Sequence, residues 1–331
     1  METRTLGNDL RVTAVGLGCM GFTLGYGKPT DKKTAMAAIR KAYKMGCRFF
    51  DTAEIYQGQA SDGSISYNEE IVGEVLHDVR DQVVIATKFG IRPAAGATTT
   101  QAVVADSRPE TIIKSVEASL KRLNTDHIDL YYQHRIDPNV TPESVAQTMK
   151  ELIAAGKITH WGISEANEEY LRRANAVCKV TAVQNRYSMM FRESERLFPV
   201  LEELNVGLVA FSPLANGFLT GHFQQSTFAD QDTRSSMPQF TPEAIKKNQE
   251  LLELLNEIAD SHHSTSAQVS LAWMLNKKPY IVPIPGSRHL DRIKANLDAA
   301  TIQMSESEVA MIDKALDAVP MSDVFGGTKV E

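Results

Sequence analysis

The stretch CRFFDTAEIY, residues 47–56, joins a short apolar run to a carboxylate and then to a phenol. Phe49 and Phe50 are typical of a buried strand, and Asp51 follows them directly. Taken alone, the stretch predicts a strand that ends at Asp51. A helix-capping aspartate and a half-buried Tyr56 would explain it as well as a functional pair would.

Seven further runs of this kind recur along the chain, each followed by a segment with helical periodicity. Together with CRFFDTA (47–53) they are VTAVGLG (12–18), QVVIATK (82–88), HIDLYYQH (127–134), ITHWGIS (158–164), VTAVQN (180–185), VGLVAFS (206–212) and PYIVPIP (279–285). Apolar strands joined through helices predict a parallel sheet covered by helices, and eight such units are the number that closes a (β/α)8 TIM barrel. We predict this fold as a single domain, residues 1–331; a doubly wound open sheet is the alternative.

The helical segments carry start and stop signals. Residues 29–46 end in Gly46, and residues 141–156 have Pro142 in the first turn. In residues 107–124, Ser107 and Glu110 have the spacing of a capping box. These signals predict helices between consecutive strands, as a (β/α)8 barrel requires.

Four segments depart from the simple alternation. TLGNDLRV (5–12) predicts a hairpin that covers the N-terminal end of the barrel. The glycine- and serine-rich residues 56–67 predict a loop. Residues 212–240 form a long loop after the seventh strand, and their interleaved phenylalanines favour a binding loop over a linker. Residues 305–319 predict an extra C-terminal helix.

Composition indicates an ordinary globular chain. Of its 331 residues, 43% are hydrophobic, and the formal net charge of −6 comes without a basic run, which argues against nucleic acid or a membrane as a partner. Three widely spaced cysteines indicate neither a disulfide framework nor a metal site. No signal peptide or run of about 18 apolar residues is present. We therefore expect a cytoplasmic location; the oligomeric state stays open.

GLGCMG, residues 16–21, matches the glycine pattern of a Rossmann dinucleotide-binding turn. That turn requires the last glycine at the start of a helix and an acidic residue about 20 positions later. Here FTLGYGKPT follows instead, and the later region reads AMAAIRKAY. We therefore interpret the glycines as allowing close approach of the backbone to a ligand.

Reactive side chains occur at the C-terminal ends of three predicted strands, where the active site of a (β/α)8 barrel lies. They are Asp51 with the nearby Tyr56, Lys88 and His134. Each has a structural explanation when taken singly. Together they suit proton transfer, because an ammonium favours the phenolate form of Tyr56 and Asp51 can hold Lys88 in place. No HExxH, HxH or CxxC motif is present, so we expect no metal and disfavour a metal-dependent barrel hydrolase.

Over essentially its whole length the chain resembles the aldo-keto reductases. The resemblance is carried, in order and at similar spacing, by FFDTAEIY, NEEIVGEVL (68–76), VVIATK and DLYYQHRID. It implies a catalytic tetrad of Asp51, Tyr56, Lys88 and His134, with Tyr56 as the general acid in carbonyl reduction. FSPLANGFLTG and DTRSSMPQF look closest to the branch of bacterial, yeast and plant reductases near pyridoxal reductase and perakine reductase.

The resemblance further implies NADP(H) as cofactor, extended across the barrel mouth. Arg292 would face the 2′-phosphate and Asn296 the adenine, and Arg288 would replace a phosphate-binding lysine that stands in some members where this chain has Gly286. Glu165 stands where many members have asparagine and receives no role. The implied cofactor residues are Gly18, Met20, Asp51, Ser164, Gln184, Phe211, Ser212, Pro213, Leu214, Gly217, Gly286, Ser287, Arg288, Arg292 and Asn296.

The substrate is predicted only as a small carbonyl compound, which the phenylalanines of residues 212–240 suggest to be apolar or aromatic. Asp232 and Arg234 in that loop could instead select a polar group or simply pair with each other. A different class of function is a sensor or regulatory subunit that binds NADP(H) on the same fold with little turnover. The complete tetrad counts against this alternative.

Overall fold

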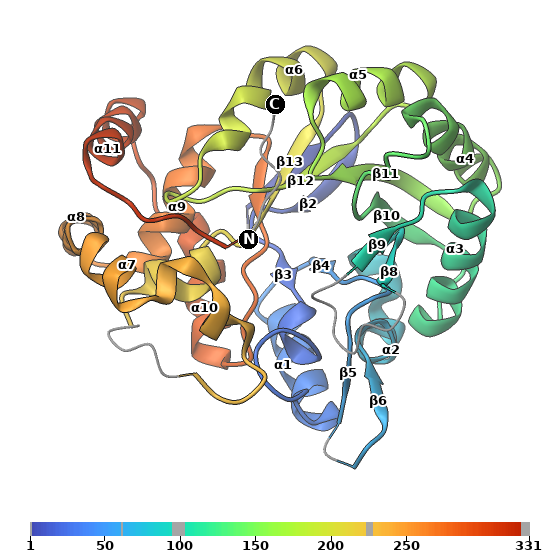
Figure 1. The fold of residues 1–331 in the computed structure, drawn as a ribbon, viewed down its shortest axis with the longest axis horizontal. Helices are drawn as coiled ribbons and strands as arrows, with labels where there is room; N and C mark the ends of the chain where they lie inside the picture. Colours follow the sequence, from blue (N-terminus) through green and yellow to red (C-terminus); the bar gives the residue numbers. More distant parts are fainter. Residues whose placement is uncertain (1, 61, 95–102, 223–227, 326–331) are drawn as a thin grey trace.

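Eight parallel strands form one curled sheet, which a computed structural model describes for residues 2–60, 62–94, 103–222 and 228–325 (Figure 1). Neighbours in the sheet follow the order of the chain, and Gly16 N–H donates to Pro283 O at 3.0 Å where the first and last strands meet. The predicted (β/α)8 barrel is confirmed. Its strands are β3 (Leu17–Gly18), β4 (Phe49–Asp51), β7 (Val84–Phe89), β10 (Ile128–Gln133), β11 (Ile158–Ser164), β12 (Ala182–Arg186), β13 (Gly207–Phe211) and β14 (Ile281–Pro283).

Helices lie around the outside of the strands (Figure 1). Most of the apolar core fills the space between the two layers, and a second apolar cluster, including Leu130 and Val209, fills the barrel interior. The α-helices are α1 (Lys32–Lys44), α2 (Asn68–Leu76), α3 (Pro109–Leu123), α4 (Pro142–Ala154), α5 (Glu168–Val177), α6 (Phe198–Leu204), α7 (Pro242–Lys247), α8 (Gln249–Ser261), α9 (Ser266–Lys277), α10 (Leu290–Asp298) and α11 (Glu306–Ala318).

Short elements complete the described chain. The 3₁₀ turns are η1 (Met20–Phe22), η2 (His77–Gln82), η3 (Glu193–Leu197), η4 (Ala215–Thr220), η5 (Thr233–Ser236), η6 (Pro238–Phe240) and η7 (Ala299–Thr301). Antiparallel pairs are formed by β1 (Thr3–Leu6) with β2 (Leu10–Thr13), β5 (Gln57–Gln59) with β6 (Ile65–Tyr67), and β8 (Ile91–Pro93) with β9 (Val103–Ala105).

The N-terminal hairpin closes the base of the barrel, as predicted. Its strands β1 and β2 pair through Leu6 and Leu10, and both leucines belong to the apolar cluster inside the barrel. A Cβ atom on Gly207, at the start of β13, would lie 2.3 Å from Leu6 Cδ2. The hairpin therefore packs tightly against the barrel floor.

Three expectations need correction. The predicted first strand, residues 12–18, is divided, because Val12 and Thr13 pair with the hairpin and only Leu17–Gly18 join the barrel. Helix α3 has Arg108 as its N-cap with no capping side chain, so the capping box from Ser107 is wrong; Asp137 accepts the Ser107 N–H instead. Part of the predicted loop at 56–67 is the β5–β6 ribbon.

GLGCMG forms the closing seam of the barrel and no Rossmann turn. Its last residues lie in the short η1 turn. A Cβ atom on Gly18 would lie 2.7 Å from Ile284 O, and one on Gly286 would lie 2.7 Å from Gly18 O. The two strand ends thus approach too closely for any side chain, so these glycines are needed for the seam itself, and the expected approach of the backbone to a ligand stays a prediction.

Gly18→Ala should lower the free energy of unfolding by about 1–3 kcal/mol, because the new methyl group must push β3 away from the segment after β14. Gly286→Ala should do the same. In urea unfolding without cofactor, the double variant should lose less than the sum of the two single losses, since both changes open one seam. Unchanged stability in either single variant would contradict this account.

Candidate active site

A buried ion pair between neighbouring strands lies at the centre of the site. Lys88 Nζ is 2.6 Å from Asp51 Oδ1, 2.7 Å from the carbonyl oxygen of Thr52 and 3.4 Å from Tyr56 Oη. The ammonium has three protons and thus one acceptor for each. Asp51 pairs with Ala86 in the sheet. Lys88 is two residues beyond Ala86 on the same strand, so its side chain lies on the same face and closer to the barrel mouth.

The Asp51 carboxylate is held from a second direction. Gln184 Nε2, on β12, donates to Asp51 Oδ2 at 2.8 Å, while Lys88 occupies the other oxygen. Burial alone would lower the pKa of Lys88, but the attraction of Asp51 and Tyr56 and their hydrogen bonds raise it above the ordinary value. Lys88 is therefore a fixed positive charge beneath the Tyr56 hydroxyl.

Tyr56 follows β4 and lies between Lys88 and His134. Its ring meets the His134 ring edge to face, with centroids 5.8 Å apart. Burial raises the pKa of Tyr56, and the nearby Lys88 charge opposes this rise without cancelling it. Lys88 thus lowers the pKa of Tyr56 as expected, but the net pKa lies above the ordinary value because loss of hydration outweighs the ammonium.

His134 completes the group at the end of β10. It is buried, and its Nδ1 has no hydrogen-bond partner within the described ranges. Burial lowers its pKa well below the ordinary value, and the charges of Arg135 and Lys88 add to this effect. The imidazole is therefore uncharged at neutral pH. The structure brings all four predicted catalytic residues together.

The residues expected at the nicotinamide end lie at neighbouring strand ends. Ser164 ends β11, Gln184 lies in β12 and Phe211 ends β13. The Ser164 hydroxyl donates to the Gln184 carbonyl oxygen at 2.9 Å. The unusual Glu165 has a left-handed φ of 53° and pairs with Arg135 at 3.2 Å.

The described parts of the loop after β13, residues 212–222 and 228–240, contact the loop after β3, and residues 223–227 lie outside the described ranges. The loop after β13 includes Ser212, Pro213 and Leu214, then Gly217 at φ 97°. Asn216 Nδ2 donates to Tyr26 Oη at 3.2 Å, and Thr233 N–H donates to Gly25 O at 3.0 Å. Asp232 and Arg234 pair with each other at 2.6 Å, as one of the two alternatives predicted.

The residues expected at the phosphate end lie between β14 and α10. Gly286 and Ser287 precede Arg288, whose Nε donates to the carbonyl oxygen of Gly21 at 2.6 Å. Arg288 Nη2 is buried without a partner in the part of the chain that is described. On α10, Arg292 is exposed and Asn296 is buried.

Sequence reasoning overlooked two basic residues at this end of the barrel. Arg135 follows His134, and its Nη1 donates to His134 O at 2.6 Å and to Ser164 Oγ at 3.3 Å. Arg186 follows Gln184 by two positions and is buried. The period-two alternation of a strand could have placed Arg186 on the same face as Gln184.

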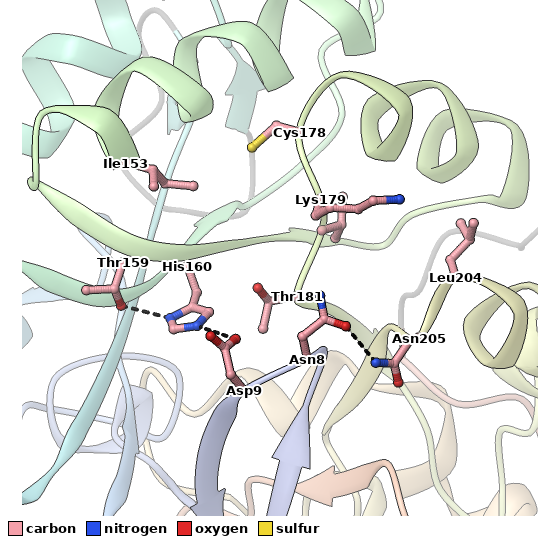
Figure 2. A pocket seen from close by; sticks show the side chains of 11 residues that line it. Asn8, Asp9, Ile153, Thr159, His160, Cys178, Lys179, Thr181, Leu204 and Asn205 are labelled. Carbon is pink, nitrogen blue, oxygen red and sulfur yellow. Dashed lines mark hydrogen bonds and ion pairs between the residues drawn. The ribbon is translucent and has the colours of Figure 1, made fainter.

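A cavity of about 210 Å³ lies at the opposite end of the barrel (Figure 2). It is bounded by the turn of the N-terminal hairpin and by residues that precede β12 and β13. His160 bonds to Asp9 and to Thr159 there, and Asn205 to Asn8 (Figure 2). None of the predicted site residues lines it, so we place the functional site at the tetrad.

No described helix combines the length and apolar character that crossing a bilayer would require. Among the same residues, no three acidic, histidine or cysteine side chains gather as metal ligands would.

Comparisons with known proteins point to one family. The sequence model of the Aldo/keto reductase family matches residues 14–317. A probable aldo-keto reductase of Glycine max is 35% identical over 318 residues, 96% of this chain and 88% of that protein. An aldo-keto reductase of Schizosaccharomyces pombe, named with NADP(+), is 35% identical over 326 residues, 96% of this chain and 92% of that protein.

Solved structures show the same similarity. A glycerol dehydrogenase of Gluconobacter oxydans superimposes with a TM-score of 0.84 at 26% identity, covering 96% of this chain and 95% of that one. A holo aldo-keto reductase of Bacillus halodurans gives a TM-score of 0.74 at 26% identity, covering 96% of both chains.

Lys88→Met should lower the free energy of unfolding by about 3–5 kcal/mol, because it leaves a buried carboxylate without its ammonium. The double variant Asp51→Asn, Lys88→Met should lose much less than the two single variants together, since it removes both charges. Urea unfolding of the three variants measures this coupling. Additive losses would show that the pair does not act as a unit.

Proposed function

The chain belongs to the aldo-keto reductase family, and we propose that it is an NADPH-dependent reductase that converts an aldehyde or ketone to an alcohol. The observation that carries this proposal is the line of contacts from Asp51 through Lys88 to Tyr56 Oη, at 2.6 and 3.4 Å. It ends in a phenol beside an uncharged imidazole, a pair suited to protonating a carbonyl oxygen.

The residues present fit NADPH. Arg288 Nη2 is buried and without a partner among the described residues, and Ser287 with Gly286 leads into the N-terminus of α10. Such an end favours phosphate, and a half-buried guanidinium with one nitrogen in need of an acceptor favours it further. The relative of Schizosaccharomyces pombe named with NADP(+) supports the same choice.

In the proposed mechanism, NADPH supplies the hydride when bound. Tyr56 donates its phenolic proton to the carbonyl oxygen, and Lys88 stabilises the phenolate that remains. Asp51 holds Lys88 in position, and Gln184 fixes the second oxygen of Asp51. His134, uncharged because of its burial, hydrogen-bonds the carbonyl oxygen and directs it toward Tyr56.

Tyr56→Phe should reduce kcat by about 10²- to 10⁴-fold and leave NADPH binding nearly unchanged, because it removes only the proton donor. Turnover is followed as NADPH consumption with aldehydes, ketones and quinones, including pyridoxal, and binding by fluorescence titration. Tyr131→Phe is the matched control, since this buried tyrosine belongs to the apolar core between strands and helices and not to the tetrad. Equal effects of the two changes would refute the role of Tyr56.

The same assay separates the reductase from the NADP(H)-binding sensor. Sustained NADPH consumption by the wild type with any of these carbonyls excludes a protein that merely binds the cofactor. Tight binding without turnover across the whole panel would favour the sensor.

Arg292→Ala should weaken NADPH binding by about 10- to 100-fold and NADH binding little, because only NADPH carries the 2′-phosphate that we assign to this guanidinium. Dissociation constants for both cofactors come from fluorescence titration. Lys294→Ala removes a cation from the same helix that already pairs with Asp298 and serves as the control. Equal losses of affinity for NADPH and NADH would contradict the assignment of the 2′-phosphate to Arg292.

A further inference from the structure

A buried cation without an acceptor lies close to the catalytic group. Arg186, the last residue of β12, is only 5% exposed. Its Nε is buried without a partner, and no hydrogen bond or ion pair joins its guanidinium to a residue in the described ranges. A buried guanidinium costs free energy unless acceptors meet its donors, so this side chain calls for an explanation.

Strand geometry places Arg186 on the side of the mouth that faces the tetrad. Side chains two residues apart on a strand lie on the same face. Gln184 reaches Asp51 Oδ2 at 2.8 Å, so the face it shares with Arg186 points to the barrel axis. Arg186 lies roughly 6.6 Å further along the strand, toward the mouth.

Aromatic rings surround the guanidinium. Its carbon lies 5.4 Å from the ring centre of Phe211, 5.8 Å from that of Phe191 and 5.6 Å from that of Phe325. These faces attract the charge but accept no strong hydrogen bond from its in-plane N–H groups. Aromatic rings thus support the cation while its hydrogen-bond donors remain available.

Arg186 keeps its charge at neutral pH. Burial lowers its pKa to about 10; the Glu165 carboxylate opposes this, and Arg135 adds to it. Glu165 is itself paired with Arg135 at 3.2 Å. The nearest carboxylate thus has a partner other than Arg186, and a positive charge remains at the mouth.

We propose that Arg186 binds an anionic group of the substrate, so that the carbonyl compound carries a carboxylate or a phosphate. This inference rests on the proposed reductase function and names its substrate class. The planar guanidinium matches both anions with paired hydrogen bonds. The surrounding phenylalanines fit an apolar or aromatic body between that anion and the carbonyl. The sequence led us to expect an apolar or aromatic carbonyl compound, and the proposal adds an anionic group at one end of it.

The test compares matched aldehydes with the full-length protein and NADPH. 4-Carboxybenzaldehyde is paired with methyl 4-formylbenzoate, and 4-formylphenyl phosphate with 4-methoxybenzaldehyde. The wild type should favour one or both anions in kcat/KM, and the preferred pair identifies carboxylate or phosphate. Arg186→Met should lower kcat/KM for the preferred anion by about 10- to 100-fold, mainly through KM, and leave the neutral partner nearly unchanged.

Two control variants test whether Arg186 has only a structural role. Arg186→Lys keeps the charge and should recover part of the preference. Arg196→Met removes a charge from an exposed arginine of the same connection after β12 and should change neither substrate. Equal losses of the anionic and neutral aldehydes in Arg186→Met, no anion preference in the wild type, or a larger loss of NADPH binding would each overturn the proposal.

Failure of the reductase function would be visible separately, as no turnover of any of the four aldehydes by the wild type. Calorimetric titration of the NADP⁺-bound protein then tests independently of turnover whether Arg186 binds an anion. Benzoate or phenyl phosphate should bind to the wild type and lose affinity in Arg186→Met, while methyl benzoate binds equally to both. Binding of neither anion would overturn the proposal.

Discussion

The site depends on one interaction, the buried ion pair of Lys88 and Asp51. An ammonium inside a barrel is costly unless every proton meets an acceptor, and here Asp51, the Thr52 carbonyl and Tyr56 supply three. One acceptor belongs to the last residue of β4 and two to the residues that follow it. The register between β4 and β7 is therefore a condition for the chemistry, because a shift by one residue would point Lys88 outward.

The same pair sets the electrostatic character of its surroundings. It holds a positive charge beneath a phenol whose burial favours the protonated form, and it contributes to keeping His134 neutral. An acid that is protonated at rest and a cation that stabilises its conjugate base are complementary requirements. Burial meets the first and proximity of the ammonium meets the second.

The barrel and its tetrad were predictable because both rest on local patterns: apolar runs of strand length, and reactive residues at their ends. Other features were not. The strand at 12–18 divides because Val12 and Thr13 pair with β1 while Leu17 and Gly18 pair with β4. Before α3, the Ser107 N–H bonds to Asp137 from another loop. The net pKa of Tyr56 depends on burial, which no motif reports. Strand alternation could have predicted which face Arg186 lies on, but only the structure shows that its Nε has no acceptor among the described residues.

The seam between the first and last strands has a consequence for the order of assembly. β3 pairs with β4 early in the chain, but its other neighbour follows β14, and the bond from Arg288 to Gly21 links positions 267 residues apart. During synthesis the first strand therefore keeps one edge unpaired until nearly the whole chain has emerged. The brevity of β3, two residues, limits how much open edge a nascent chain presents to other strands.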